Sequence, residues 1–240
     1  MPSLKWPDGA NISQREFYYD WEYEWGVVNY DGTIDVCDCC GRFFIQSAWD
    51  RSFCHKLPVI FTDGSCLNNG TGNARAGFGV AVGENPHDKW SYSFTGPGER
   101  TSQKAELLAV TQGIAQAAQA ISQKPKKYCW SQQKTTKAFV IATDSKSVVQ
   151  GVINNLPEWK ANGFLNSKGY PIRDEAEFRQ LDATITKYEN LGWSIGLWYV
   201  PREYNQEADD LAGNGARADE GPPRQTFVNT YQVVEYCTEN

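Results

Sequence analysis

The spacing of apolar residues between positions 57 and 218 is the feature that most constrains the fold. Residues 58–62, 76–83 and 90–95 are short apolar or alternating runs separated by turn-forming residues, which is typical of three antiparallel strands. From residue 101 to 123 the apolar spacing changes to that of a helix. The sequence therefore predicts an α/β fold that begins with a three-stranded antiparallel meander.

Strands and helices alternate in the remainder of this region. The pattern predicts a buried strand over 138–143, helices over 145–154 and 174–190, a last strand over 193–200 and a closing helix over 205–218. Successive parallel strands need a crossover connection, which is usually a helix. We therefore expect a mixed five-stranded sheet, with three antiparallel strands followed by parallel strands and crossover helices.

Four acidic residues lie at strand ends or in helix starts of this predicted fold, where their side chains could face a common centre. They are Asp63, Glu106, Asp144 and Asp209. Asp210 follows directly, but it is rotated by about 100° around the helix, so Asp209 is the one expected to face the site. Converging carboxylates repel one another unless cations neutralise them, and Mg²⁺ or Mn²⁺ prefers such oxygen ligands. The pattern indicates metal-assisted phosphodiester chemistry.

The charge distribution is compatible with a nucleic-acid partner. The chain has a formal net charge of −6, but residues 57–217 carry 17 Lys and Arg against 16 Asp and Glu. With four of those carboxylates assigned to a cation, the remaining surface of this region is basic. Phosphate contacts need local positive charge and not a positive total.

Seven short motifs resemble, in order and spacing, the type 1 ribonuclease H family, and most closely its eukaryotic form. They are Thr-Asp-Gly-Ser (62–65), Asn-Gly (69–70), Arg-Ala-Gly-Phe-Gly (75–79), Ser-Gln-Lys-Ala-Glu-Leu (102–107), Thr-Asp-Ser (143–145), Trp-Lys-Ala-Asn-Gly-Phe (159–164) and Asn-Gln-Glu-Ala-Asp-Asp-Leu-Ala (205–212). The resemblance covers residues 57–218. It implies a ribonuclease H-like fold and an endonuclease that cuts the RNA strand of an RNA/DNA hybrid duplex, leaving 3′-hydroxyl and 5′-phosphate ends.

The resemblance also implies a two-metal mechanism, with two Mg²⁺ per site for which Mn²⁺ can substitute. Asp63 would bridge both ions, with Glu106 and Asp144 on one ion and Asp209 on the other.

Substrate contacts follow from the same resemblance. Asn69 and Gln103 match positions that contact ribose 2′-hydroxyls, which distinguish RNA from DNA. The full set of implied substrate-binding residues is Asn69, Thr101, Ser102, Gln103, Ser145, Trp159, Phe164 and Asn205. Within it, Thr101 and Asn205 match a DNA-phosphate pocket, and Trp159 and Phe164 match an aromatic protrusion, basic through Lys160 and Lys168, that grips the DNA strand. The alternatives are a turn or helix-cap role for Asn69 and Gln103, and loop packing for the two aromatic residues.

One departure from the family pattern leaves other functions open. Family members often carry a histidine between the last strand and the last helix, whereas residues 201–205 contain none. We expect slower or altered turnover, with Arg202 or Glu203 as a partial substitute. The alternatives are a catalytically weak protein that binds RNA/DNA hybrids, and a four-carboxylate 3′–5′ exonuclease in which Tyr204 precedes the last aspartate.

The flanks lie outside the resemblance and define two further predicted regions. Residues 1–56 form an aromatic, cysteine-containing extension, and residues 219–240 form an acidic tail. Half of a zinc-binding pattern is present in the extension: Cys37, Cys40, Cys54 and His55. A structural Zn²⁺ and reduced, buried cysteines are the two readings of this pattern.

The sequence contains no run of about 18 apolar residues and no secretion signal at its start. We expect a monomeric, intracellular protein with no membrane partner; nucleus, cytoplasm and mitochondrion are not distinguished.

Overall fold

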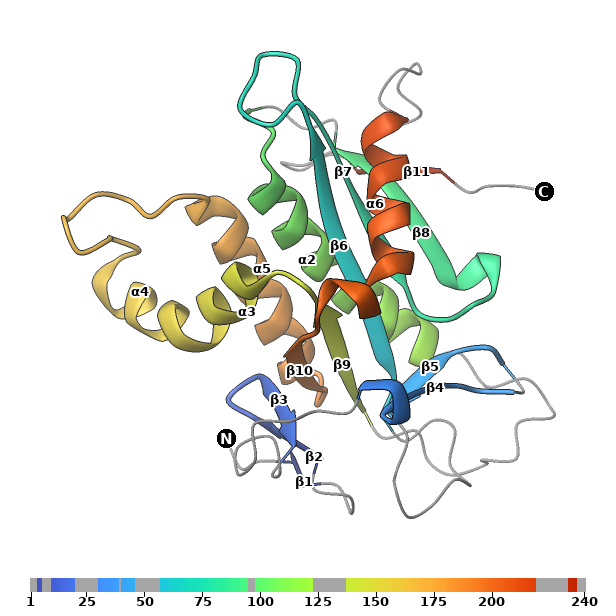
Figure 1. Ribbon diagram of the computed structural model, residues 1–240. Helices are drawn as coiled ribbons and strands as arrows, with labels where there is room; N and C mark the ends of the chain where they lie inside the picture. Colours follow the sequence, from blue (N-terminus) through green and yellow to red (C-terminus); the bar gives the residue numbers. More distant parts are fainter. Residues whose placement is uncertain are drawn as a thin grey trace.

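The computed structural model describes residues 4–5, 10–19, 30–38, 40–45, 57–94, 98–122, 137–218 and 233–236. A five-stranded mixed sheet forms its centre (Figure 1). Its strands are β6 (Val59–Leu67), β7 (Arg75–Ala81), β8 (Lys89–Phe94), β9 (Ala138–Thr143) and β10 (Ser194–Tyr199), in the spatial order β10-β9-β6-β7-β8. β6, β7 and β8 are antiparallel, whereas β9 runs parallel to β6 and β10 parallel to β9. The predicted α/β class and the mixed five-stranded sheet are confirmed.

Strands from both flanks extend this sheet to nine strands. The N-terminal strands β1 (Leu4–Lys5), β2 (Ala10–Ser13) and β3 (Glu16–Tyr19) are added beside β10, and β11 (Val233–Tyr236) is added beside β8. The expected sheet includes neither flank. A separate two-stranded sheet, β4 (Ile34–Val36) and β5 (Phe43–Ile45), also comes from the N-terminal extension.

Helices cover both faces of the sheet (Figure 1). They are α2 (Ser102–Ser122), α3 (Lys146–Gln150), α4 (Leu156–Asn162), α5 (Glu175–Asn190) and α6 (Gln206–Arg217). α2 and α5 pack together on one face, α6 lies on the other, and α4 projects to the side. Within the described residues, no helix is long and apolar enough to cross a membrane.

The region after α3 differs from the prediction, because residues 157–162 are helical and not a loop. A single π-helical turn, Gly151–Asn155, joins α3 to α4. Pro157 lies in the first turn of α4, directly after this π-helical turn. The chain therefore stays helical through the proline, and the irregular turn lies just before it.

The alternation of side chains in β9 divides the interior into two apolar clusters. Phe139 and Ile141 point toward α2 and α5, while Val140 and Ala142 point to the opposite face, with α6 and the N-terminal extension. On that second face, aromatic side chains of the extension surround Trp198 of β10. The ring centroids of Phe17, Tyr30 and Tyr19 lie 5.1, 5.4 and 6.1 Å from that of Trp198.

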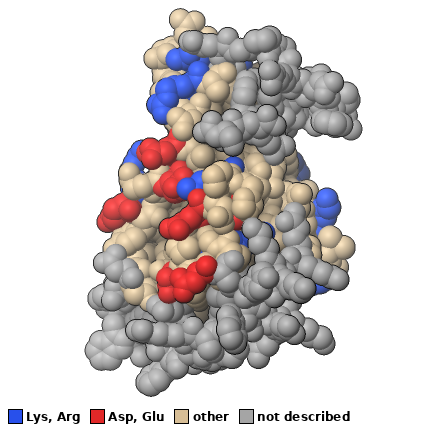
Figure 2. Space-filling view, turned by 90° about the vertical axis from the view of Figure 1, so that its right-hand side faces the viewer, with Lys and Arg blue, Asp and Glu red and all other residues tan. Residues whose placement is uncertain are grey.

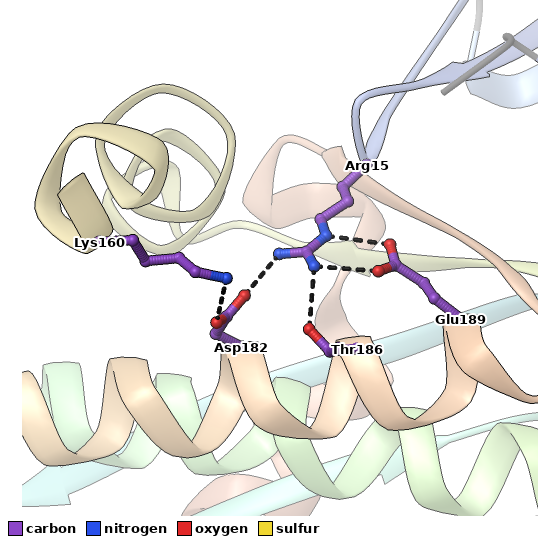
Figure 3. Close-up of polar contacts among 5 residues, drawn as sticks. All are labelled: Arg15, Lys160, Asp182, Thr186 and Glu189. Atoms are coloured by element: carbon purple, nitrogen blue, oxygen red, sulfur yellow. Dashed lines mark hydrogen bonds and ion pairs between the residues drawn. The ribbon is translucent and has the colours of Figure 1, made fainter.

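Arg15 fastens the β2–β3 hairpin to α5 (Figure 3). Its guanidinium group donates hydrogen bonds to Asp182 at 2.9 Å, to both carboxylate oxygens of Glu189 at 3.0 Å, and to Thr186 at 3.3 Å. Lys160 of α4 makes a 2.7 Å ion pair with the other oxygen of Asp182. Burial opposes ionisation of Asp182, but the hydrogen bonds from Lys160 and Arg15 outweigh it and hold the pKa of Asp182 below its ordinary value.

We expect Arg15→Met to lower the free energy of unfolding at pH 7 by about 2 kcal/mol, because it leaves two largely buried carboxylates without their main partner. A carboxylate with a depressed folded-state pKa stabilises the fold above its unfolded pKa, and that contribution is lost as the pH falls through the folded value. The difference between the two proteins should therefore shrink below about pH 4. Urea unfolding at pH 7 and in acid measures it.

Glu207→Gln is the matched control, because Glu207 is exposed and forms a 3.0 Å surface ion pair with Lys89. It should change the free energy of unfolding by less than about 1 kcal/mol. An Arg15→Met protein as stable as the unsubstituted chain at pH 7 would show that the hairpin is not fastened to α5 in this way.

Candidate active site

Asp63 lies within β6 at the centre of the sheet, opposite Gly79 of β7, and its side chain is buried. Burial, the charge of Asp144, a hydrogen bond shared with Asp144 and the charge of Asp209 together raise the pKa of Asp63 to about 8. The backbone N–H of Gly64 acts in the opposite direction. The repulsion among these carboxylates is the electrostatic condition that a bound cation relieves.

Glu106 reaches the same place from the second turn of α2. Ser145, which follows Asp144 at the end of β9 and caps α3, donates a 2.5 Å hydrogen bond to Glu106 Oε2. Burial and the charge of Asp144 raise the pKa of Glu106, although hydrogen bonds from Ser145 and Ser147 act against this. Ser145 therefore joins the strand that carries Asp144 to the helix that carries Glu106.

Asp209 approaches from α6, while the neighbouring Asp210 is exposed. Asp209 accepts a hydrogen bond from Arg202, and their ion pair lies at the surface. Asn205, at the start of α6, is buried, and its amide nitrogen donates to Asp144 Oδ1 and to the carbonyl of Thr62, both at 3.1 Å. The turn before α6 thus contacts two of the four carboxylates.

The donor set fits a hard divalent cation, because every donor is a carboxylate oxygen. In the part of the chain that the structure describes, no three His, Cys, Asp or Glu side chains are grouped closely enough to hold an ion as they stand. Three of the carboxylates instead accept hydrogen bonds from protein donors: Glu106 from Ser145, Asp144 from Asn205 and Asp209 from Arg202. Of these donors only Arg202 is charged, so the repulsion that raises the pKa of Asp63 is left for a bound cation to reduce.

The sequence profile of the RNase H family matches residues 55–217, which contain all four carboxylates. The chain belongs to the ribonuclease H family. Ribonuclease H1 of Rattus norvegicus is 33% identical over 171 residues, which cover 71% of this chain and 54% of that protein. Ribonuclease H1 of Homo sapiens is 30% identical over 169 residues, covering 70% of this chain and 53% of the human protein. The chain thus spans about half the length of these two relatives.

A bacterial relative is matched over almost its whole length: Ribonuclease HI of Neisseria meningitidis serogroup B, 29% identical over 163 residues, covering 68% of this chain and 97% of that protein. Two solved structures of the foamy viral protease-reverse transcriptase share the fold. The one in complex with RNA/DNA hybrid gives a TM-score of 0.51 at 22% identity, covering 68% of this chain and 20% of the viral chain. The one in complex with dsDNA gives 0.50 at 25% identity, with coverages of 68% and 96%.

The other predicted substrate-binding residues lie in three places. Asn69 is exposed in the turn between β6 and β7, and Gln103 is half-buried in the first turn of α2. Thr101 is buried, and its hydroxyl accepts a hydrogen bond from the backbone N–H of Lys104, which caps α2; Ser102 is the first residue of that helix. Asn205 bonds within the carboxylate cluster, as described above. These positions and hydrogen bonds do not test nucleic-acid binding, so the contacts of these residues with nucleic acid stay predictions.

The aromatic side chains of the predicted protrusion pack inward. Phe164 is buried beneath the guanidinium of Arg179, which lies 3.7 Å from its ring centroid. Trp159 is half-buried and meets Phe178 edge-on at 5.0 Å. These contacts are packing contacts, as in the alternative reading, although Trp159 lies in α4 and not in a loop; they do not test contact with a DNA strand. Tyr170, in the loop after α4, is 67% exposed. This exposed tyrosine lies between Lys168 and Arg173 and is not among the predicted substrate-binding residues.

The cysteine pattern is only half within the described residues. Cys37 is buried, its side chain is hydrogen-bonded to that of Cys40, and its carbonyl accepts a hydrogen bond from Gly41 N–H at 2.6 Å. Burial and the neighbouring Cys37 raise the pKa of the Cys40 thiol to about 12. Cys54 and His55 lie outside the described residues. The structural Zn²⁺ stays a prediction.

Proposed function

We propose that this chain is an endoribonuclease that hydrolyses the RNA strand of RNA/DNA hybrids with two divalent cations, leaving 3′-hydroxyl and 5′-phosphate ends. The observation that carries the proposal is the meeting of Asp63 and Asp144 on adjacent parallel strands, with Glu106 and Asp209 approaching from α2 and α6. Membership of the ribonuclease H family, and homologues named Ribonuclease H1, support the same reaction.

The four carboxylates would hold the cations, which supply Lewis acidity and a water of lowered pKa when bound. The neighbouring side chains orient these carboxylates: Ser145 fixes Glu106, and Asn205 fixes Asp144. Family members often carry a histidine in the turn before the last helix, and this chain has Arg202 there. The ion pair of Arg202 with Asp209 supports the proposal that Arg202 partly substitutes for that histidine. Asn69 and Gln103 are proposed to read the ribose 2′-hydroxyls.

The distribution of surface charge favours binding of the hybrid from one side of the protein. Figure 2 shows Asp and Glu side chains grouped at mid-height on the face that lies to the right of Figure 1. The exposed side of α6 carries Glu207 and Asp210. Phosphates are repelled by such a surface. We infer that the hybrid approaches from the side of α2 and α4, where Lys160, Lys168 and Arg173 have exposed side chains.

The decisive experiment is incubation of the chain with an end-labelled RNA/DNA hybrid in Mg²⁺, beside RNA/RNA and DNA/DNA duplexes. We expect internal RNA fragments from the hybrid alone, and a loss of at least about 10³-fold in rate for Asp144→Asn, because a cation ligand stabilises the transition state by several kcal/mol. Asp210→Asn is the matched control and should keep its activity, because Asp210 points away from the site.

Other outcomes select the alternatives. A ladder of products shortened one nucleotide at a time would identify a 3′–5′ exonuclease. Hybrid binding without cleavage in either Mg²⁺ or Mn²⁺ would identify a binding protein. The proposal includes a monomeric, intracellular protein, and light scattering of the purified chain tests the first of these properties.

A further inference from the structure

The N-terminal extension contacts the turn that leads into the catalytic helix α6. This turn, η4 (Arg202–Tyr204), connects β10 to α6. The ring of Tyr30, from the turn η1 (Tyr30–Gly32), is stacked on the ring of Tyr204 with centroids 4.8 Å apart and planes 29° apart. In Figure 1 a blue helical turn of the N-terminal extension lies just below the orange-red turn that begins α6.

Tyr30 also packs against the central sheet. Its ring is stacked on that of Trp198 of β10, with centroids 5.4 Å apart and planes 25° apart. Trp198 is in turn packed edge-on by Phe17 and Tyr19 of β3, the strand that pairs with β10. A stack of three rings, Trp198, Tyr30 and Tyr204, therefore runs from β10 to the turn before α6. Stacked aromatic rings have a restricted relative geometry, so the stack restricts the position of Tyr204.

The residues on both sides of Tyr204 touch the carboxylates. Asn205, the next residue, donates hydrogen bonds to Asp144 and to the carbonyl of Thr62, directly before Asp63. Its own carbonyl accepts the N–H of Asp209 and so begins α6. Arg202, two residues before Tyr204, bonds to the Asp209 carboxylate. A displacement of Tyr204 is therefore transmitted to two sides of the candidate active site.

We propose that Tyr30 is a positioning residue: through its stack on Tyr204 it holds the turn that places Asn205 and Arg202 against the catalytic carboxylates. Tyr30 lies outside residues 55–217, the part that matches the family profile, so the proposed contact comes from the N-terminal extension and not from the matched region. The expected effect on the reaction rate rests on the proposed hydrolysis of hybrids. The stack of Tyr30 on Tyr204, which we call the brace, is a property of the protein without substrate.

The test compares Tyr30→Leu and Tyr30→Phe with Phe17→Leu in the full chain. Phe17→Leu is the matched control, because Phe17 packs on the same Trp198 but makes no ring contact with Tyr204 among the described residues. For Tyr30→Leu we expect kcat on hybrid to fall about ten-fold with KM changed less than about two-fold, because small misplacement of reacting groups mainly costs rate. Tyr30→Phe keeps the ring and should restore kcat. Phe17→Leu should lower the melting temperature and leave kcat unchanged.

A second readout needs no catalysis. Backbone amides of residues 202–206 should exchange hydrogen faster in Tyr30→Leu than in the unsubstituted chain, and at the original rate in Tyr30→Phe and Phe17→Leu. If the unsubstituted chain cuts no hybrid, the proposed function fails while this exchange pattern still supports the brace. Unchanged exchange in Tyr30→Leu, or an equal loss of kcat in Tyr30→Leu and Phe17→Leu, would overturn the positioning role.

Discussion

Replacement of Asp63 by Asn is expected to abolish hydrolysis of hybrids and, in the absence of divalent cations, to stabilise the protein. Asp63 is buried beside Asp144 and within the field of Asp209, and this environment raises its pKa to about 8. The amide has nearly the same shape as the carboxylate but no charge. It therefore removes a destabilising repulsion and, at the same time, a negatively charged ligand that would help to hold the proposed cations.

The loss of activity and the gain in stability are measured separately. We expect kcat/KM to fall at least about 10³-fold. The free energy of unfolding in EDTA should rise, because a carboxylate whose pKa is raised on folding destabilises the folded state above its unfolded pKa. Adding Mg²⁺ should raise the melting temperature of the unsubstituted chain, because it binds the folded state, and should have a smaller effect on Asp63→Asn.

Asp210→Asn is the control for this substitution, because it makes the same chemical change one residue beyond Asp209 on the exposed side of α6. It should alter neither the rate nor the response to Mg²⁺. A loss of stability in EDTA for Asp63→Asn would contradict the repulsion that the structure shows, and hydrolysis at the original rate would remove Asp63 from the proposed mechanism.

The parts of the fold that the sequence predicts are those set by local patterns. The change from alternating to helical spacing is local, so the order of the five central strands and their helices could be read from it. The choice of Asp209 over Asp210 depends only on the geometry of one helix, and the structure places Asp209 close enough to Asp63 to raise its pKa. Convergence of the carboxylates follows once the strand order is known.

The N-terminal hairpin could not be predicted in this way. Its turn residues, Gln14 and Arg15, both have positive φ, 50° and 72°, a conformation in which hairpins favour Asn-Gly. The turn is instead held by hydrogen bonds from Arg15 to residues 167 to 174 positions away in the sequence, which no local pattern reveals. Similarly, the local sequence does not show that Phe164 is buried, because Arg179, which covers its ring, lies on the separate helix α5.

Gly64→Ala should destabilise the fold strongly while leaving every carboxylate intact. Gly64 follows Asp63 in β6, where α2 crosses the strand so closely that a Cβ at this position would lie 2.1 Å from the backbone nitrogen of Glu106. The obstacle is backbone and cannot rotate away. Accommodating the methyl group requires α2 to move, and Glu106 moves with it away from Asp63. We expect a loss of about 3 kcal/mol in the free energy of unfolding.

The rate should fall as well, by about 100-fold, because the displacement is of the order of 1 Å between groups that must act together. Denaturant unfolding measures the first effect, and single-turnover cleavage at a temperature where the variant is fully folded measures the second.

Gly72→Ala distinguishes close approach from the general effect of a glycine substitution. Gly72 lies in the exposed turn between β6 and β7, and a Cβ there would meet no atom within 4 Å. This variant should stay within about 0.5 kcal/mol of the unsubstituted chain and keep its rate. If Gly64→Ala behaved like Gly72→Ala, β6 and α2 would not be in contact at Asp63, and the approach of Glu106 to the other carboxylates would need another explanation. If Gly64→Ala lost stability but kept its rate when folded, α2 would move without separating Glu106 from Asp63, and backbone proximity at Gly64 would be a requirement of packing alone.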